Sequence, residues 1–169
     1  MSVTVKADAL VKAAQKTLGW DYEFGKAETG KVDCSGLIVY LMRGLEGRVP
    51  YHGSNSMYRL DCVGAPLPMS QVKPGYLCFK CRPWRDAQKA NRYYGKVPGD
   101  IYHVGIMGFD GKIINAASKK LGVIKSNSDV WDSCAKLKGV VYPDALSTSK
   151  LDELIARLDA LLDEYRKGD

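Results

Sequence analysis

The stretch Asp33-Cys34-Ser35-Gly36-Leu37 marks the point where a glycine-containing loop passes into an apolar helical run. Cys34 therefore stands in the first turn of a predicted helix, beside unpaired backbone N–H groups and the positive end of the helix dipole. Both features stabilise a thiolate, so we expect a lowered pKa for the Cys34 thiol. A cysteine in this position is a candidate nucleophile.

The chain contains two histidines that could act as a base for this cysteine. His52 lies in a loop rich in Gly, Ser and Asn and is predicted to be a surface residue. His103 begins a strand-like segment, His103-Val104-Gly105-Ile106, and is the candidate general base. Such a pair needs a third group that orients the imidazole.

The turn after the His103 strand decides whether Asn115 can be that third group. With a two-residue Asp110-Gly111 turn, Asn115 points away from His103. With a three-residue loop, 109–111, Gly111 supplies the left-handed residue and Asn115 lies opposite Gly105. Asn115 is then a diagonal neighbour of His103, at a Cα distance of about 7–8 Å. Gly105 has no side chain to block their approach.

The order of the predicted elements indicates an α+β fold, since helices come first and strands later. Apolar residues recur at helical spacing over residues 4–18, and the helix that begins at Cys34 runs to about residue 45. Residues 47–75 read as loops with a short helix near 55–60. The predicted strands are 76–80, 101–109, 112–117, 123–125 and 137–142.

The last part of the chain is predicted to be separate, with one domain at 1–143 and a linker and amphipathic helix at 144–169. Ser149 and Asp152 resemble a capping box, and Leu151, Leu158 and Tyr165 are spaced as in a heptad. This helix either packs on its own domain or mediates self-association, and the pattern favours neither.

Charge and composition narrow the function classes. The net charge of +6 is concentrated before the acidic last helix, which suits a polyanionic partner such as nucleic acid or an anionic bacterial cell wall. Membrane-spanning runs and a signal-peptide pattern are not found, so we expect synthesis in the cytoplasm and no membrane partner.

The five cysteines form an odd set, which argues against a disulfide framework. Cys78 and Cys81 form a C-x-x-C pair that Cys62 and Cys134 could complete as a zinc site. A second C-x-x-C is lacking, so we interpret Cys78 as a small apolar residue of a strand and expect neither metal nor cofactor.

Five short motifs occur in order along the chain, and together they resemble the NlpC-type cell-wall peptidases. They are Tyr22-x-Phe24-Gly25, Asp33-Cys34-Ser35-Gly36-Leu37, Lys73-Pro74-Gly75, His103-Val104-Gly105-Ile106 and Ile114-Asn115-Ala116. The resemblance implies a papain-like fold with N-terminal helices packed on a central antiparallel sheet. It implies the catalytic residues Cys34, His103 and Asn115, and the substrate-binding residues Tyr22, Asp33 and Ser35.

The chain also departs from the family pattern. Tyr76 follows Pro74-Gly75 where the family usually has Asp, and Lys26 replaces the second glycine of the usual pair. The insertion at 81–99 is longer than is typical and is expected to border the cleft.

The resemblance implies a hydrolase that cleaves peptide or isopeptide bonds in peptidoglycan stem peptides, acting at the bacterial cell wall. Without a signal peptide, a phage lysis enzyme or a tail-associated hydrolase is one expectation. The alternatives are an amidase or acyltransferase that uses the same Cys–His pair, and a non-enzymatic module that binds cell wall or nucleic acid, with nucleic acid the less favoured.

Overall fold

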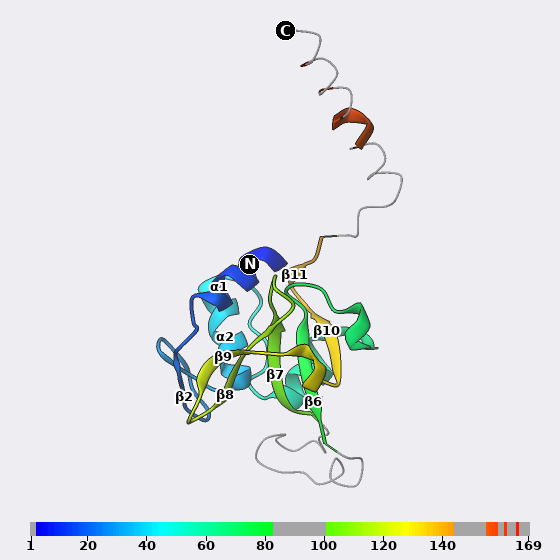
Figure 1. The fold of residues 1–169 in the computed structure, drawn as a ribbon. Coiled ribbons are helices and arrows are strands. Elements are labelled where there is room, and N and C mark those ends of the chain that lie inside the picture. Colours follow the sequence, from blue (N-terminus) through cyan, green and yellow to red (C-terminus); the bar gives the residue numbers. More distant parts are fainter. Residues whose placement is uncertain (1–2, 83–100, 144–154, 159–160, 162–164, 166–169) are drawn as a thin grey trace.

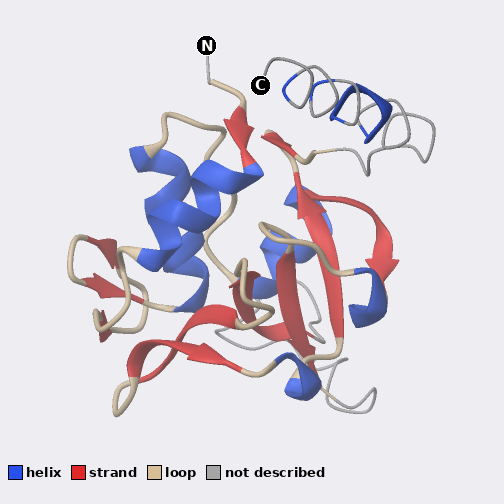
Figure 2. Ribbon diagram, turned by 45° about the horizontal axis from the view of Figure 1, so that its top comes forward, coloured by secondary structure: helices blue, strands red, loops and turns tan. Residues whose placement is uncertain are grey.

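Two helices are packed against one side of a sheet (Figures 1 and 2). The structure is a computed structural model that describes residues 3–82, 101–143, 155–158, 161 and 165. Helix α1 (Ala7–Gln15) buries one stripe, Ala7, Leu10, Val11 and Ala14, at the spacing of a helix face. Helix α2 (Cys34–Gly44) begins at the predicted residue. It is buried on most sides because α1, the sheet and a small strand layer surround it.

The central sheet has six antiparallel strands in the order β5-β10-β6-β7-β8-β9. This confirms the predicted α+β class and central antiparallel sheet. The strands are β5 (Cys62–Leu67), β6 (Leu77–Cys81), β7 (Ile101–Met107), β8 (Ile113–Ser118), β9 (Gly122–Ser126) and β10 (Ser133–Leu137).

Two predictions about the sheet are wrong. The last strand was placed at 137–142, whereas β10 ends at Leu137 and the short β11 (Val140–Val141) pairs with β1 (Val5–Lys6) in a separate sheet. Residues 62–67 were expected in a loop, yet they form β5. Its Gly and Pro residues suggested a loop, but an edge strand pairs on one side only and tolerates them.

Shorter elements surround the sheet. A three-stranded layer lies beside α2, in the order β2-β4-β3. The segment after α2 forms short helical turns, near the expected position. The short strands are β2 (Asp21–Tyr22), β3 (Ala27–Glu28) and β4 (Lys31–Val32). The short helical elements are α3 (Ser54–Ser56), a π-helical turn (Met57–Asp61) and 3₁₀ turns at Met69–Gln71 and Ser128–Val130.

The hairpin of β7 and β8 has the three-residue loop on which the role of Asn115 depends. Ile106 pairs with Ile114, and the backbone N–H of Gly108 donates to the carbonyl of Lys112 at 2.8 Å. Gly111 has a φ of 73°, in the left-handed region where glycine carries no steric penalty. Of the two alternatives that the sequence left open, the structure therefore has the three-residue loop at 109–111, which makes Asn115 a neighbour of His103.

Apolar side chains fill both faces of the sheet. The larger cluster lies between the sheet and the helices and includes Leu10, Leu37 and Phe79. The smaller cluster, on the other face, consists of Tyr76, Cys78, Met107, Ile113, Trp131 and Cys134. The interpretation of Cys78 as a packed apolar residue is confirmed, because it is fully buried in this cluster.

Several predictions lie wholly or partly outside the described residues. Most of the insertion at 81–99 and residues 144–154 are among these, so the division into 1–143 and 144–169 stays a prediction. Residues 155–158 are helical and exposed, with Ile155 and Leu158 at 50% and 58% exposure. Self-association through this helix also stays a prediction. Within the described ranges, helices are too short or too polar to cross a membrane.

Candidate active site

A cleft of about 800 Å³ opens where the start of α2 faces the sheet. It is lined by all six site residues that were predicted from the sequence, which are Cys34, His103, Asn115, Tyr22, Asp33 and Ser35. Residues that sequence reasoning did not nominate also line it, among them His52, Lys80, Arg82 and Tyr102.

The His103 imidazole is oriented by Asn115. Nε2 of His103 lies 2.9 Å from Oδ1 of Asn115. The Asn115 amide is itself fixed, since Nδ2 donates to the carbonyl of Ile113 and to Oγ of Ser126, each at 3.1 Å. Its Oδ1 must therefore accept, so His103 carries its proton on Nε2 and presents Nδ1 as the proton acceptor.

Trp131 supports this arrangement, and sequence reasoning missed it. Its indole stacks on the His103 ring at a centroid distance of 5.2 Å, and its Nε1 donates to Oγ of Ser126 at 3.1 Å. Ser126 thus joins the indole to the Asn115 amide. Trp131 comes from the chain before β10, far from His103 in sequence, so local patterns gave no signal of the contact.

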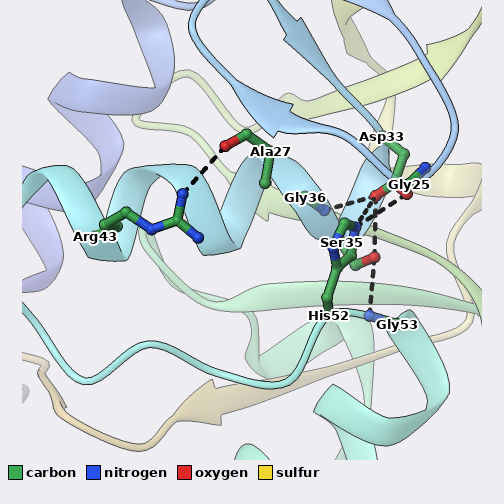
Figure 3. Close-up of polar contacts among 8 residues, drawn as sticks. All are labelled: Gly25, Ala27, Asp33, Ser35, Gly36, Arg43, His52 and Gly53. Carbon is green, nitrogen blue, oxygen red and sulfur yellow. Dashed lines mark hydrogen bonds and ion pairs between the residues drawn. The ribbon is translucent and has the colours of Figure 1, made fainter.

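Asp33 caps α2, as Figure 3 shows. Its carboxylate accepts from the backbone N–H groups of Gly36 at 2.6 Å and Gly25 at 2.7 Å, and from Oγ of Ser35 at 3.0 Å. Burial would raise the pKa of Asp33, but the bonds from His52 and Gly36 outweigh it and hold the pKa below the usual range.

His52 is an exposed residue, as predicted, and it also lines the cleft, which the sequence did not predict. Its side chain is 34% exposed, and Nε2 lies 3.0 Å from both carboxylate oxygens of Asp33. The Asp33 bond raises the pKa of His52. The loop is held on both sides of His52: the N–H of Tyr51 donates to the buried Asp61, and the N–H of Gly53 donates to Oγ of Ser35 (Figure 3).

The expected lowering of the Cys34 pKa is wrong for this structure. Burial and the neighbouring Asp33 carboxylate raise the pKa of the thiol to about 12, outweighing the backbone N–H groups of Val104 and Ser35. Burial lowers the pKa of His103, against the effect of its bond to Asn115. At neutral pH the site therefore holds a neutral thiol and a neutral imidazole, a pair suited to proton transfer during attack.

The other cysteines pack within or against the two apolar clusters. Cys78 and Cys134 are opposite each other on β6 and β10 inside the smaller apolar cluster. Among the residues that the structure describes, three or more His, Cys, Asp or Glu side chains are nowhere placed to share a metal ion.

Comparison with solved structures identifies the fold as that of the NlpC/p60 domains. No protein-family model and no curated protein sequence matches the chain. The NlpC/p60 domain of the peptidoglycan hydrolase SagA is similar at 24% identity with a TM-score of 0.61, covering 79% of this chain and all of that domain.

Two longer proteins share the fold as well. NlpC1 from Trichomonas vaginalis is 16% identical with a TM-score of 0.60, and an NlpC/p60 family protein from Bacillus cereus is 18% identical with a TM-score of 0.59. Each match covers 78% of this chain. The chain spans only 43% and 40% of the length of these two proteins.

Proposed function

We propose that the protein is a cysteine peptidase that cleaves peptide or isopeptide bonds in peptidoglycan stem peptides. The observation that carries the proposal is the 2.9 Å contact of His103 with Asn115 in the cleft that also holds Cys34 at a helix start. The substrate class is supported by the fold, because a solved structure of that fold is a peptidoglycan hydrolase domain.

The reaction follows from the neutral Cys34–His103 pair. As Sγ of Cys34 attacks the scissile carbonyl carbon, its proton passes to Nδ1 of His103. The imidazolium then gives this proton to the leaving amine as the C–N bond breaks. His103 then deprotonates a water molecule, which attacks the thioester carbonyl carbon. The C–S bond breaks, the carboxylic acid is released, and the Cys34 thiolate takes the proton back from His103. The backbone N–H of Cys34 is the proposed donor to the oxyanion.

Tyr22, Asp33 and Ser35 are the proposed substrate contacts. Ser35 already donates to Asp33 and accepts from Gly53, so its main effect is on the shape of the cleft wall. Nε2 of His52 lies 3.0 Å from both oxygens of the Asp33 carboxylate. A substrate amine must therefore displace His52 to bind there.

The site of action that we propose is the bacterial cell wall, where the net charge of +6 suits anionic polymers. A phage lysis or tail-associated role is the proposed setting.

The test is digestion of purified peptidoglycan, with the released peptides identified by mass spectrometry. We expect defined fragments from the wild type and none from Cys34→Ala or His103→Ala. Fragments from Cys34→Ala, or none from the wild type, would overturn the proposal and favour the binding module. Digestion with an added amine separates the acyltransferase alternative, because a transferase forms the new amide in preference to the free acid. Release of ammonia from side-chain amides, without release of peptide fragments, would indicate the amidase alternative.

A further inference from the structure

Lys80 lies at the cleft wall directly beside the general base. It is paired with His103 across β6 and β7, so the two side chains emerge on the same face of the sheet. Its Nζ is 5.1 Å from the centre of the Trp131 ring, the ring on which His103 stacks. A cation held on an indole face is fixed more firmly than a surface lysine.

Among the described residues that line the cleft, basic side chains outnumber acidic ones. Among the described residues that line it, Asp33 is the one acid, and its side chain is only 6% exposed. Its carboxylate already accepts hydrogen bonds from the backbone N–H groups of Gly25 and Gly36, and it lies 3.0 Å from Nε2 of His52. Two basic side chains, Lys80 and Arg82, line the other wall, and the Arg82 guanidinium lies 5.5 Å from the Tyr102 ring centre. Two cations on one wall of a concave site attract an anionic group.

We propose that Lys80 binds a carboxylate of the substrate close to the scissile bond, so that the cleft prefers stem peptides with free carboxyl groups over amidated ones. The inference rests on the proposed function above and adds the substrate feature that the cleft selects. A carboxamide has the shape of a carboxylate without its charge, so it loses the attraction to the ammonium group while it still fits.

The first experiment compares native peptidoglycan with the same material after its carboxyl groups are converted to carboxamides by carbodiimide and ammonia. We expect the wild type to release fragments from the native material about tenfold faster, as one charged hydrogen bond predicts. Lys80→Met should bring the two rates together, while Lys80→Arg should keep the preference. Lys136→Met is the matched control: Lys136 lies on β10 against Tyr76 and Tyr142 and does not line the cleft.

The second experiment needs no turnover. Cys34 is alkylated with iodoacetate, an anion, or with neutral iodoacetamide at one fixed alkaline pH, and the modified cysteine is located by peptide mapping. We expect Lys80→Met to lower the ratio of the iodoacetate rate to the iodoacetamide rate about fivefold, whereas Lys136→Met leaves it unchanged.

The outcomes separate the two proposals. Equal digestion of native and amidated material by the wild type overturns the Lys80 inference and leaves the peptidase. If the wild type digests neither material, the peptidase proposal is overturned, and the proposed carboxylate preference is overturned with it. The alkylation ratio then still decides whether Lys80 attracts anions to Cys34, and an equal ratio in Lys80→Met and wild type excludes that role.

Discussion

Replacing Gly105 by alanine tests whether close packing of the hairpin orients His103. A Cβ at Gly105 would lie 2.6 Å from Cγ2 of Ile113, 2.9 Å from Cβ of Asn115 and 2.9 Å from the carbonyl oxygen of Ile114. These atoms are buried and belong to the neighbouring strand, so the methyl group must push that strand away. Overpacking of this kind costs about 1–3 kcal/mol.

The same displacement acts on the His103–Asn115 contact. Their bond measures 2.9 Å, so a shift of about 0.6 Å takes it beyond hydrogen-bonding distance and removes about 1 kcal/mol more. We therefore expect Gly105→Ala to lower the free energy of unfolding in urea by about 2–4 kcal/mol. In NMR spectra, His103 should lose its preference for the tautomer protonated on Nε2.

Gly44→Ala is the control for the Gly105 variant. It makes the same chemical change at the end of α2, where an added Cβ meets nothing within 4 Å. This variant should be about as stable as the wild type or up to about 1 kcal/mol more stable. If Gly105→Ala matched the wild type in both stability and tautomer, the argument that the register of β7 and β8 orients His103 through Asn115 would be refuted.

Three further predictions concern the groups around the cleft. Because Cys34 has a pKa of about 12, its alkylation by iodoacetamide should rise about tenfold per pH unit above neutrality, and a plateau near pH 7 would instead indicate a thiolate–imidazolium pair. Asp33 has a lowered pKa and His52 a raised one, so their pair should stabilise the fold most between the ordinary values of 3.8 and 6.5. That contribution is lost as pH falls through the pKa of Asp33 or rises through that of His52, and urea titrations of His52→Ala should lack this maximum. Trp131→Phe keeps a ring against His103 but removes the bond to Ser126, so it should cost about 1 kcal/mol in urea unfolding, and no loss would show that this bond contributes nothing.

The sequence predicted the part of the site that depends on local rules. The start of α2 follows from the passage of a glycine-containing loop into an apolar helical run at Cys34. For Asn115, strand alternation left two placements that depend on the loop length, and the structure has the three-residue loop that ends in a left-handed glycine. Both rules act over a few residues, so the sequence could predict the helix start and narrow the side of Asn115 to two alternatives.

What the sequence did not predict depends on contacts between distant segments. Trp131 reaches His103 only because β10 lies beside β6, and His52 reaches Asp33 only because a loop returns to the start of α2. The pKa of Cys34 was misjudged for the same reason. The position of Cys34 at a helix start follows from the local sequence. Burial of its thiol depends on the whole fold, and it has the larger effect on the pKa.

The stacking of His103 on Trp131 gives the protein an intrinsic optical signal. An imidazolium next to an indole quenches its fluorescence, whereas a neutral imidazole does so much less. Because the two rings are stacked with centroids 5.2 Å apart and an interplanar angle of 27°, the emission of Trp131 should report the protonation of His103. Subtracting the emission of His103→Ala isolates that signal from the other tryptophans. Proton arrival at the base can thus be followed in unlabelled protein, during a stopped-flow pH jump or a single turnover.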